Sequence, residues 1–255
     1  MPFEIVGPGP LEYERLDVGG RGAPTIVMLH EGLGSTALWK DFPARLAQAT
    51  RSNVVVYSRH GYGRSAPLQG VRAVRYMHDE ALAVLPELLR HLQIENPILI
   101  GHSDGASIAI IYAGSHDHVR GLVLLAPHVF VEELSIRSIA AAKVSFENTI
   151  LPTLLARHHR DAGRTFWGWN NIWLDPDFRS WNIEEYLPKI SCPILVIQGL
   201  QDQYGTMAQA EAIRKQSAGP VEVLPLEGCQ HSPQRDRPEA VLDAIKKFVV
   251  QVGGN

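Results

Sequence analysis

Short apolar segments recur along the chain and constrain its fold more than any other feature. They occupy residues 25–30, 53–57, 97–101, 121–126, 193–199 and 221–226. Most are apolar at nearly every position, which is typical of parallel strands covered on both faces. Because helix-like segments lie between them, the alternation predicts an α/β fold with a mostly parallel twisted sheet and helices on both faces. Residues 3–6 and 12–18 are expected to add an antiparallel edge. We interpret residues 1–255 as a single domain.

The composition narrows the class of protein. The net charge is −3, so there is no basic excess of the kind that nucleic-acid-binding proteins carry. No apolar run approaches the roughly 18 residues of a membrane helix, and the N-terminal residues do not resemble a signal peptide. The two cysteines, Cys192 and Cys229, cannot form a disulfide framework, so we expect a reduced, cytoplasmic protein. No histidine or cysteine spacing suggests a metal site, and we expect neither metal nor cofactor. The oligomeric state is left open.

A long segment between two predicted strands breaks the alternation. Residues from about 131 to 188 have a mostly helical pattern and hold Trp167, Trp169, Trp173 and Trp181, four of the five tryptophans. Long insertions in compact domains are usually functional, so we predict a helical lid. The alternative is a helical subdomain with its own aromatic core.

The sequence GHSDG at 101–105 places polar residues between a predicted strand and a predicted helix. It fits the pattern G-x-S-x-G, in which a serine occupies a sharp, strained strand-to-helix turn. The following helix would point its N-terminus, which favours negative charge, at the same place. The pattern predicts that Ser103 is a nucleophile; the alternative is a structural serine in a tight turn.

A serine nucleophile needs a general base and an acid that orients it. Asp202 directly follows the segment 193–199, and His231 follows the segment 221–226. Both would lie at the edge of the sheet where Ser103 emerges, in the chain order serine, acid, histidine. Glu132 and Glu133, which follow the segment 121–126, are the rival acids. Asp202 would then only cap the helix that begins near residue 206.

Five short stretches together resemble the α/β-hydrolases, in particular the lidded, single-domain serine hydrolases. They are HEGLGS at 30–35, YSRHGYGRS at 57–65, GHSDGAS at 101–107, GLQDQYG at 199–205 and GCQHSP at 228–233. The resemblance covers nearly the whole chain. It implies that Ser103 is the nucleophile, His231 the general base and Asp202 the orienting acid.

The resemblance also implies an oxyanion hole made by two backbone N–H groups. One belongs to Asp104, and alignment with the family makes Gly32 the other, with Glu31 and Leu33 as alternatives. The Asp104 side chain is harder to interpret, because a carboxylate beside the nucleophile opposes a developing oxyanion unless it is paired.

These observations predict hydrolysis of a carboxylic ester, or of a lactone or thioester, through an acyl-enzyme. Aromatic rings make good walls for apolar groups, so we expect Trp167, Trp169 and Trp173 to bind a small to medium, partly apolar small-molecule substrate. The alternatives are a carbon–carbon bond hydrolase acting on aromatic-ring-fission products, a ligand receptor on the same fold, and a lyase.

Overall fold

The fold is built on one eight-stranded sheet, in a computed structural model that describes residues 2–253. Its strands are β1 (Phe3–Val6), β2 (Gly9–Asp17), β3 (Thr25–Leu29), β4 (Asn53–Tyr57), β5 (Ile98–His102), β6 (Gly121–Leu125), β7 (Ile194–Gly199) and β8 (Val221–Leu226). The strand order is β1-β2-β4-β3-β5-β6-β7-β8. The β1–β2 and β2–β4 pairs are antiparallel and the other pairs are parallel. The predicted sheet and its antiparallel edge are therefore confirmed.

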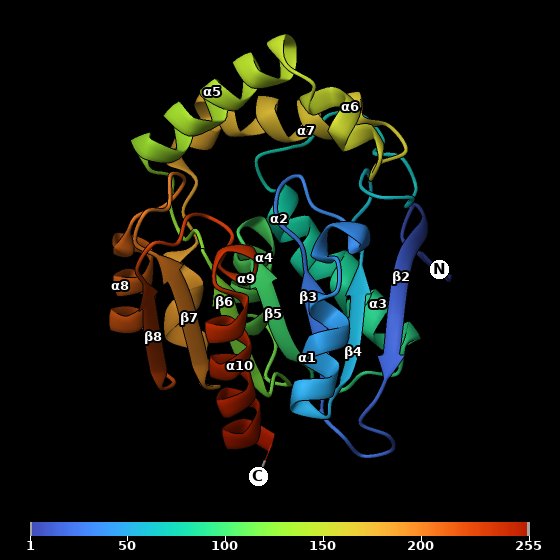
Figure 1. The fold of residues 1–255 in the computed structure, drawn as a ribbon, viewed down its shortest axis with the longest axis vertical. Coiled ribbons are helices and arrows are strands. Elements are labelled where there is room, and N and C mark those ends of the chain that lie inside the picture. Colours follow the sequence, from blue (N-terminus) through green and yellow to red (C-terminus); the bar gives the residue numbers. More distant parts are fainter. Residues whose placement is uncertain (1, 254–255) are drawn as a thin grey trace.

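Helices cover both faces of the sheet, which explains why the strands are apolar at successive positions (Figure 1). In β3, Ile26 and Met28 pack with α1 (Phe42–Thr50) and α10 (Pro238–Gly253). Val27 and Leu29 belong to the core on the opposite face, with α3 (Leu85–His91), α4 (Asp104–Ala113) and α8 (Met207–Gln216). Side chains alternate between the two faces along a strand, so a strand covered on both faces is apolar at nearly every position.

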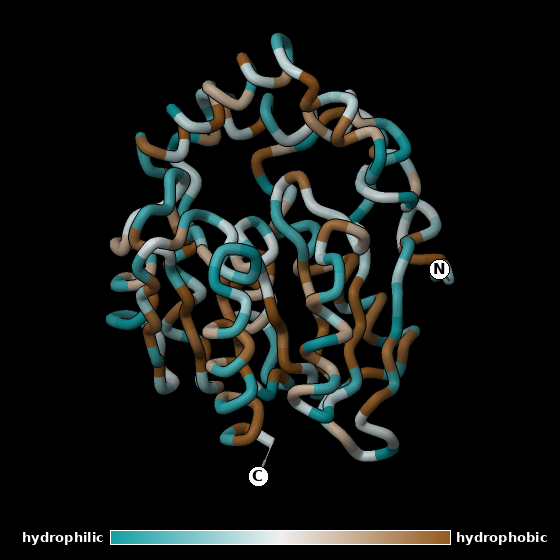
Figure 2. Tube along the Cα trace, in the orientation of Figure 1, coloured by the Kyte–Doolittle hydropathy of each residue, from teal (hydrophilic) through white to brown (hydrophobic). Residues whose placement is uncertain are grey.

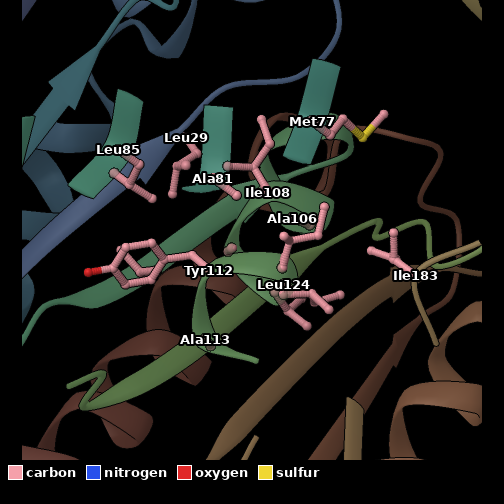
Figure 3. Close-up of a cluster of buried hydrophobic side chains, with 14 of the residues drawn as sticks. Leu29, Met77, Ala81, Leu85, Ala106, Ile108, Tyr112, Ala113, Leu124 and Ile183 are labelled. Atoms are coloured by element: carbon pink, nitrogen blue, oxygen red, sulfur yellow. The ribbon is translucent and has the colours of Figure 1, made fainter. Parts of the chain in front are cut away.

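Helix α4 lies in the middle of this second core, and all of its residues from Asp104 to Ala113 are buried. Its Ala106 and Ile108 lie among the apolar side chains of the strands and of the neighbouring helix (Figure 3). Apolar residues dominate the central strands, and polar residues gather on the outside (Figure 2). The turn that precedes α4 is thus anchored at both ends in rigid, packed structure.

The helical segment between β4 and β5 is irregular. It comprises α2 (Tyr76–Asp79), a π-helical turn η2 (Glu80–Val84) and α3. Pro86 lacks an N–H and its ring would collide with the carbonyl four residues earlier, so a wider turn just before it relieves the conflict.

The insertion between β6 and β7 is helical, and it lies over the edge of the sheet at the top of Figure 1. It consists of α5 (Glu133–Asn148), α6 (Leu151–Ala156), α7 (Ala162–Leu174) and the short 3₁₀ helices η3 (Pro176–Ser180) and η4 (Glu184–Lys189). Aromatic rings hold it together; Phe146 stacks on Phe166 with centroids 3.9 Å apart. It therefore has an aromatic core of its own, and its role as a lid stays a prediction.

Within residues 2–253, no helix combines the length and the apolar character needed to cross a membrane. Cys192 and Cys229 are both free thiols.

Candidate active site

Ser103 occupies a strained turn between β5 and α4. Its backbone angles, φ of 53° and ψ of −117°, lie in a region that residues other than glycine seldom adopt. A Cβ at Gly101 would collide with the backbone of Gly105, and one at Gly105 would collide with the backbone of Leu29. The two glycines therefore let strand and helix approach closely enough to form the turn.

His231 and Asp202 form a hydrogen-bonded pair at the same edge of the sheet. His231 lies in the loop between β8 and the short helix α9 (Pro233–Asp236), and Asp202 lies in the turn after β7. His231 Nδ1 is 2.9 Å from each carboxylate oxygen of Asp202. The His102 side chain holds this loop in place, because its Nε2 donates to the carbonyl of His231 at 2.7 Å. Because Nδ1 of His231 is bonded to Asp202, Nε2 is the ring nitrogen left to act on a substrate.

The surroundings of Asp202 keep its carboxyl group ionised, although the residue is nearly buried, at only 8% exposed. Its Oδ1 accepts from the backbone N–H of Tyr204 at 2.7 Å, and its Oδ2 accepts from Gln198 Nε2 at 2.9 Å. Burial alone would raise the pKa of the carboxyl, but the hydrogen bond and positive charge of His231 outweigh it and lower the pKa.

The rival acids point elsewhere. Glu132 accepts hydrogen bonds from the backbone N–H and the hydroxyl of Thr206, at 2.9 and 2.7 Å, at the start of α8. Glu133 is exposed and pairs with Arg179 at 2.6 Å. Both carboxylates are engaged in structural contacts, whereas Asp202 contacts the histidine.

A cavity of about 110 Å³ beneath the helical insertion brings several of the predicted site residues together. Ser103 and His231 line it, as do Asp104 and Gly32. Its other lining residues are Glu31, Leu33, His128, Ser135, Ile139, Trp169, Trp173 and Tyr204. The walls combine aromatic and apolar side chains with a few polar groups, as is usual for small-molecule sites.

The loop after β3 is fixed by its Glu31 carbonyl. This oxygen accepts from His30 Nδ1 at 2.7 Å, from the N–H of Gly34 at 3.0 Å and from Arg59 Nη2 at 2.9 Å. In a trans peptide the carbonyl and the next N–H point in opposite directions, so these bonds turn the N–H of Gly32 away from Arg59. The Trp169 indole packs directly against the Cα of Gly32, where a Cβ would collide with it.

The Asp104 side chain is paired, which resolves the difficulty raised by its position beside Ser103. Its Oδ2 accepts from the hydroxyl of Tyr76 at 2.7 Å and lies 3.6 Å from Arg59 Nη1. Asp104 and Arg59 are both buried, at 0% and 1% exposed. Trp173 Nε1 in turn donates to the hydroxyl of Tyr76 at 3.1 Å. Arg59 thus links Asp104 to the Glu31 carbonyl, and Tyr76 links Asp104 to the insertion.

The structure separates the three tryptophans named from the sequence. Trp169 and Trp173 line the cavity that contains Ser103. Trp167 lines a different, larger hollow of about 460 Å³ between α7 and the loop that contains Arg72. That hollow includes none of the residues Ser103, Asp202 and His231.

Four lining residues were not singled out from the sequence: His128, Ser135, Ile139 and Tyr204. Two of them, His128 and Tyr204, carry rings close to the predicted base. Their rings lie beside that of His231, with centroids 5.7 and 4.7 Å from it. A signal was present, because His128 follows β6 after two residues and so falls at the same edge of the sheet as Ser103. Within residues 2–253, no group of three or more histidine, cysteine or acidic side chains is placed to hold a metal ion.

Comparison with known proteins defines the family to which this chain belongs. The profile of the Alpha/beta hydrolase family matches residues 26–244, which include Ser103, Asp202 and His231. The chain belongs to this family, and the predicted family and fold are confirmed.

The relatives and structural neighbours of the chain are named for several different activities. A proline iminopeptidase from Lactobacillus helveticus is 24% identical over 292 residues, covering 98% of this chain and 97% of the relative. An esterase from Thermogutta terrifontis has a similar structure, with 20% identity, a TM-score of 0.74 and coverage of 99% of this chain and 98% of the other. An enol-lactonase from Burkholderia xenovorans LB400 has 20% identity, a TM-score of 0.76 and coverage of 98% and 100%. At this identity the two structures establish the fold alone.

Proposed function

We propose that the protein is a serine hydrolase that cleaves small carboxylic esters through an acyl-enzyme on Ser103. One observation carries this proposal: a serine on a strained strand-to-helix turn shares a small cavity with a histidine that is hydrogen-bonded to a buried carboxylate. This combination supports the proposal because a nucleophile, a base and an orienting acid are the three groups that activate a serine hydroxyl.

His231 Nε2 takes the proton of the Ser103 hydroxyl while the oxygen attacks the acyl carbon. Asp202 holds Nδ1–H and so keeps Nε2 unprotonated, and it stabilises the imidazolium that forms. The imidazolium then protonates the departing alcohol. A water molecule activated by the same histidine releases the acid and restores Ser103.

The negative charge of the tetrahedral intermediate is held by the N–H groups of Gly32 and Asp104. The first N–H groups of a helix have no partner within the helix, and Asp104 is the first residue of α4. The bonds to the Glu31 carbonyl favour Gly32 over its neighbours as the second donor. Such donors, fixed before the reaction, supply a large part of the rate enhancement in enzymes of this kind.

The cavity size indicates a small substrate with a short acyl group, because the acyl group and part of the alcohol must share the space. A cavity of roughly 150 Å³ can hold benzene, and the present one measures about 110 Å³. We therefore expect acyl groups of roughly two to four carbons, lying against Trp169 and Ile139.

The charges in the cavity favour an ester over a substrate with a free amino group. Glu31 and Asp104 are the acidic residues among those that line it. Asp104 is paired with Arg59, and Glu31 lies 3.4 Å from His102 Nδ1 and 3.6 Å from Arg235 Nη2. Arg59 and Arg235 thus already partly neutralise the two carboxylates, which weakens their attraction for a protonated amine.

The test is a chain-length series of p-nitrophenyl esters from acetate to decanoate, with prolyl p-nitroanilide alongside because a relative is named a proline iminopeptidase. We expect kcat/KM to be highest for the shortest esters and to fall steeply beyond butyrate. Faster cleavage of the anilide than of every ester would overturn the ester assignment. Turnover by Ser103→Ala within tenfold of the wild type would overturn the nucleophile.

A further inference from the structure

His128 is a second imidazole in the proposed active site, and the mechanism does not use it. It is 2% exposed and lines the cavity with Ser103 and His231. Its backbone is fixed, because its carbonyl accepts from the hydroxyl of Ser107 at 2.6 Å. The ring packs edge-on against Trp173, with centroids 5.4 Å apart. Its position is therefore set by its surroundings.

The ring of His128 has unused hydrogen-bonding capacity. Nδ1 is buried and has no hydrogen-bond partner among the described residues. The Nδ1–Cε1 edge faces Gly205, which offers it no side chain. Nδ1 is therefore out of reach of a molecule in the cavity. No hydrogen bond engages Nε2 among the described residues, and this is the nitrogen that a bound molecule can partner.

His128 is not placed to act as the base. The carboxylate of Asp202 is bonded to His231, and the Glu132 carboxylate is bonded to Thr206 and Gln209. Burial, and next the positive charge of His231, lower the pKa of His128 to about 4. At neutral pH it is an uncharged ring with one donor and one acceptor. Such a ring matches a neutral hydroxyl, which also donates and accepts, better than it matches an ion.

The location of His128 also indicates which part of the substrate it contacts. The rings of His128 and Tyr204 are both neighbours of His231. His231 must reach the leaving oxygen to protonate it, so groups beside its ring lie along the leaving alcohol. Trp169 packs instead on Gly32, at the predicted oxyanion loop, and forms an apolar wall.

We propose that His128 binds a hydroxyl group in the alcohol part of the substrate, so that the preferred substrates are short-chain esters of hydroxylated alcohols. This inference rests on the proposed function. It assigns the polar side of the cavity to the leaving group and the apolar side to the acyl group.

Two pairs of esters, each pair differing by a hydroxyl in place of a methyl group, test the proposal by pH-stat titration. The alcohol pair is 2-hydroxyethyl acetate and propyl acetate, and the acyl pair is ethyl glycolate and ethyl propionate. The wild type should prefer 2-hydroxyethyl acetate to propyl acetate by about tenfold in kcat/KM, the scale of one neutral hydrogen bond. His128→Leu should bring that ratio close to one, and His128→Asn should restore part of it. Effects common to both esters cancel in the ratio, so a general loss of activity does not affect the result.

Other outcomes of the same measurements would contradict the proposal. A ratio that His128→Leu leaves unchanged, or a change confined to the acyl pair, would overturn the role of His128 while the proposed function stands. Absence of turnover on all four esters and on p-nitrophenyl acetate by the wild type would overturn both. The melting temperature of each variant checks that the comparison is made on folded protein.

Discussion

Replacing Arg59 with methionine removes a side chain that contacts both predicted halves of the oxyanion hole. Arg59 Nη1 lies 3.6 Å from Asp104 Oδ2, and Nη2 donates to the Glu31 carbonyl at 2.9 Å. Two separate losses are expected. The Asp104 carboxylate would be left buried without its countercharge, and the peptide that presents the N–H of Gly32 would lose one of the three bonds that orient it.

The two losses have different magnitudes and can be separated. Breaking a buried ion pair from one side costs about 3–5 kcal/mol of the free energy of unfolding. The double variant Arg59→Met/Asp104→Asn removes both charges and should recover most of that stability. Loss of an oxyanion-hole donor lowers kcat on the order of 10²–10³-fold. Because Gly32 would be misaligned rather than removed, we expect a loss of about 10²-fold in both variants.

Urea unfolding and the steady-state kinetics of p-nitrophenyl acetate hydrolysis measure the two effects. We expect the double variant to be nearly as stable as the wild type and still low in kcat, with little change in KM. If the double variant regained wild-type kcat as well as stability, Arg59 would act only by neutralising Asp104, and the argument from the Glu31 peptide would be wrong.

Three further predictions follow from the same geometry. Asp202→Asn should fold but leave His231 in the wrong tautomer, lowering kcat on the order of 10⁴-fold; a loss below tenfold would reject Asp202 as the orienting acid. Trp169→Ala should change the ranking of esters by acyl length and raise KM, whereas Trp167→Ala, in the separate hollow, is the matched control and should preserve the ranking; identical rankings in both would exclude Trp169 as a wall of the acyl site. Burial lowers the pKa of His128 in the folded protein to about 4, so as the pH falls the imidazole is protonated in the unfolded chain at a higher pH than in the folded protein. Between about pH 6.5 and pH 4 the wild type should therefore lose about 3 kcal/mol more of its unfolding free energy than His128→Leu does, and parallel pH curves would refute this.

The fold could be predicted from the sequence because each central strand is buried on both faces. In β4, all five residues from Asn53 to Tyr57 are buried, so the apolar run is continuous and easy to recognise. The irregularity at η2 could be placed only roughly. A proline such as Pro86 indicates a disturbed helix, but whether the chain kinks or widens a turn there depends on what packs around it.

The site was less predictable in its side-chain partners. Ser103, Asp202 and His231 lie in the connections that follow β5, β7 and β8, so the topology alone brings them to one edge. The partners of Asp104 come from the loop after β4 and from α2, and no spacing rule connects Arg59 or Tyr76 with a residue so far along the chain. Likewise, Trp167 and Trp169 are two positions apart on α7 and therefore face different sides of the helix.

The most direct test of the central claim is mass spectrometry of the protein after reaction with a fluorophosphonate. We expect one adduct, on the peptide that contains Ser103, together with complete loss of ester hydrolysis. Ser103→Ala should remain unlabelled and turn over on the order of 10³–10⁶-fold more slowly than the wild type. An adduct on another residue, or Ser103→Ala hydrolysing p-nitrophenyl acetate at a rate within tenfold of the wild type, would contradict the assignment of Ser103 as the nucleophile.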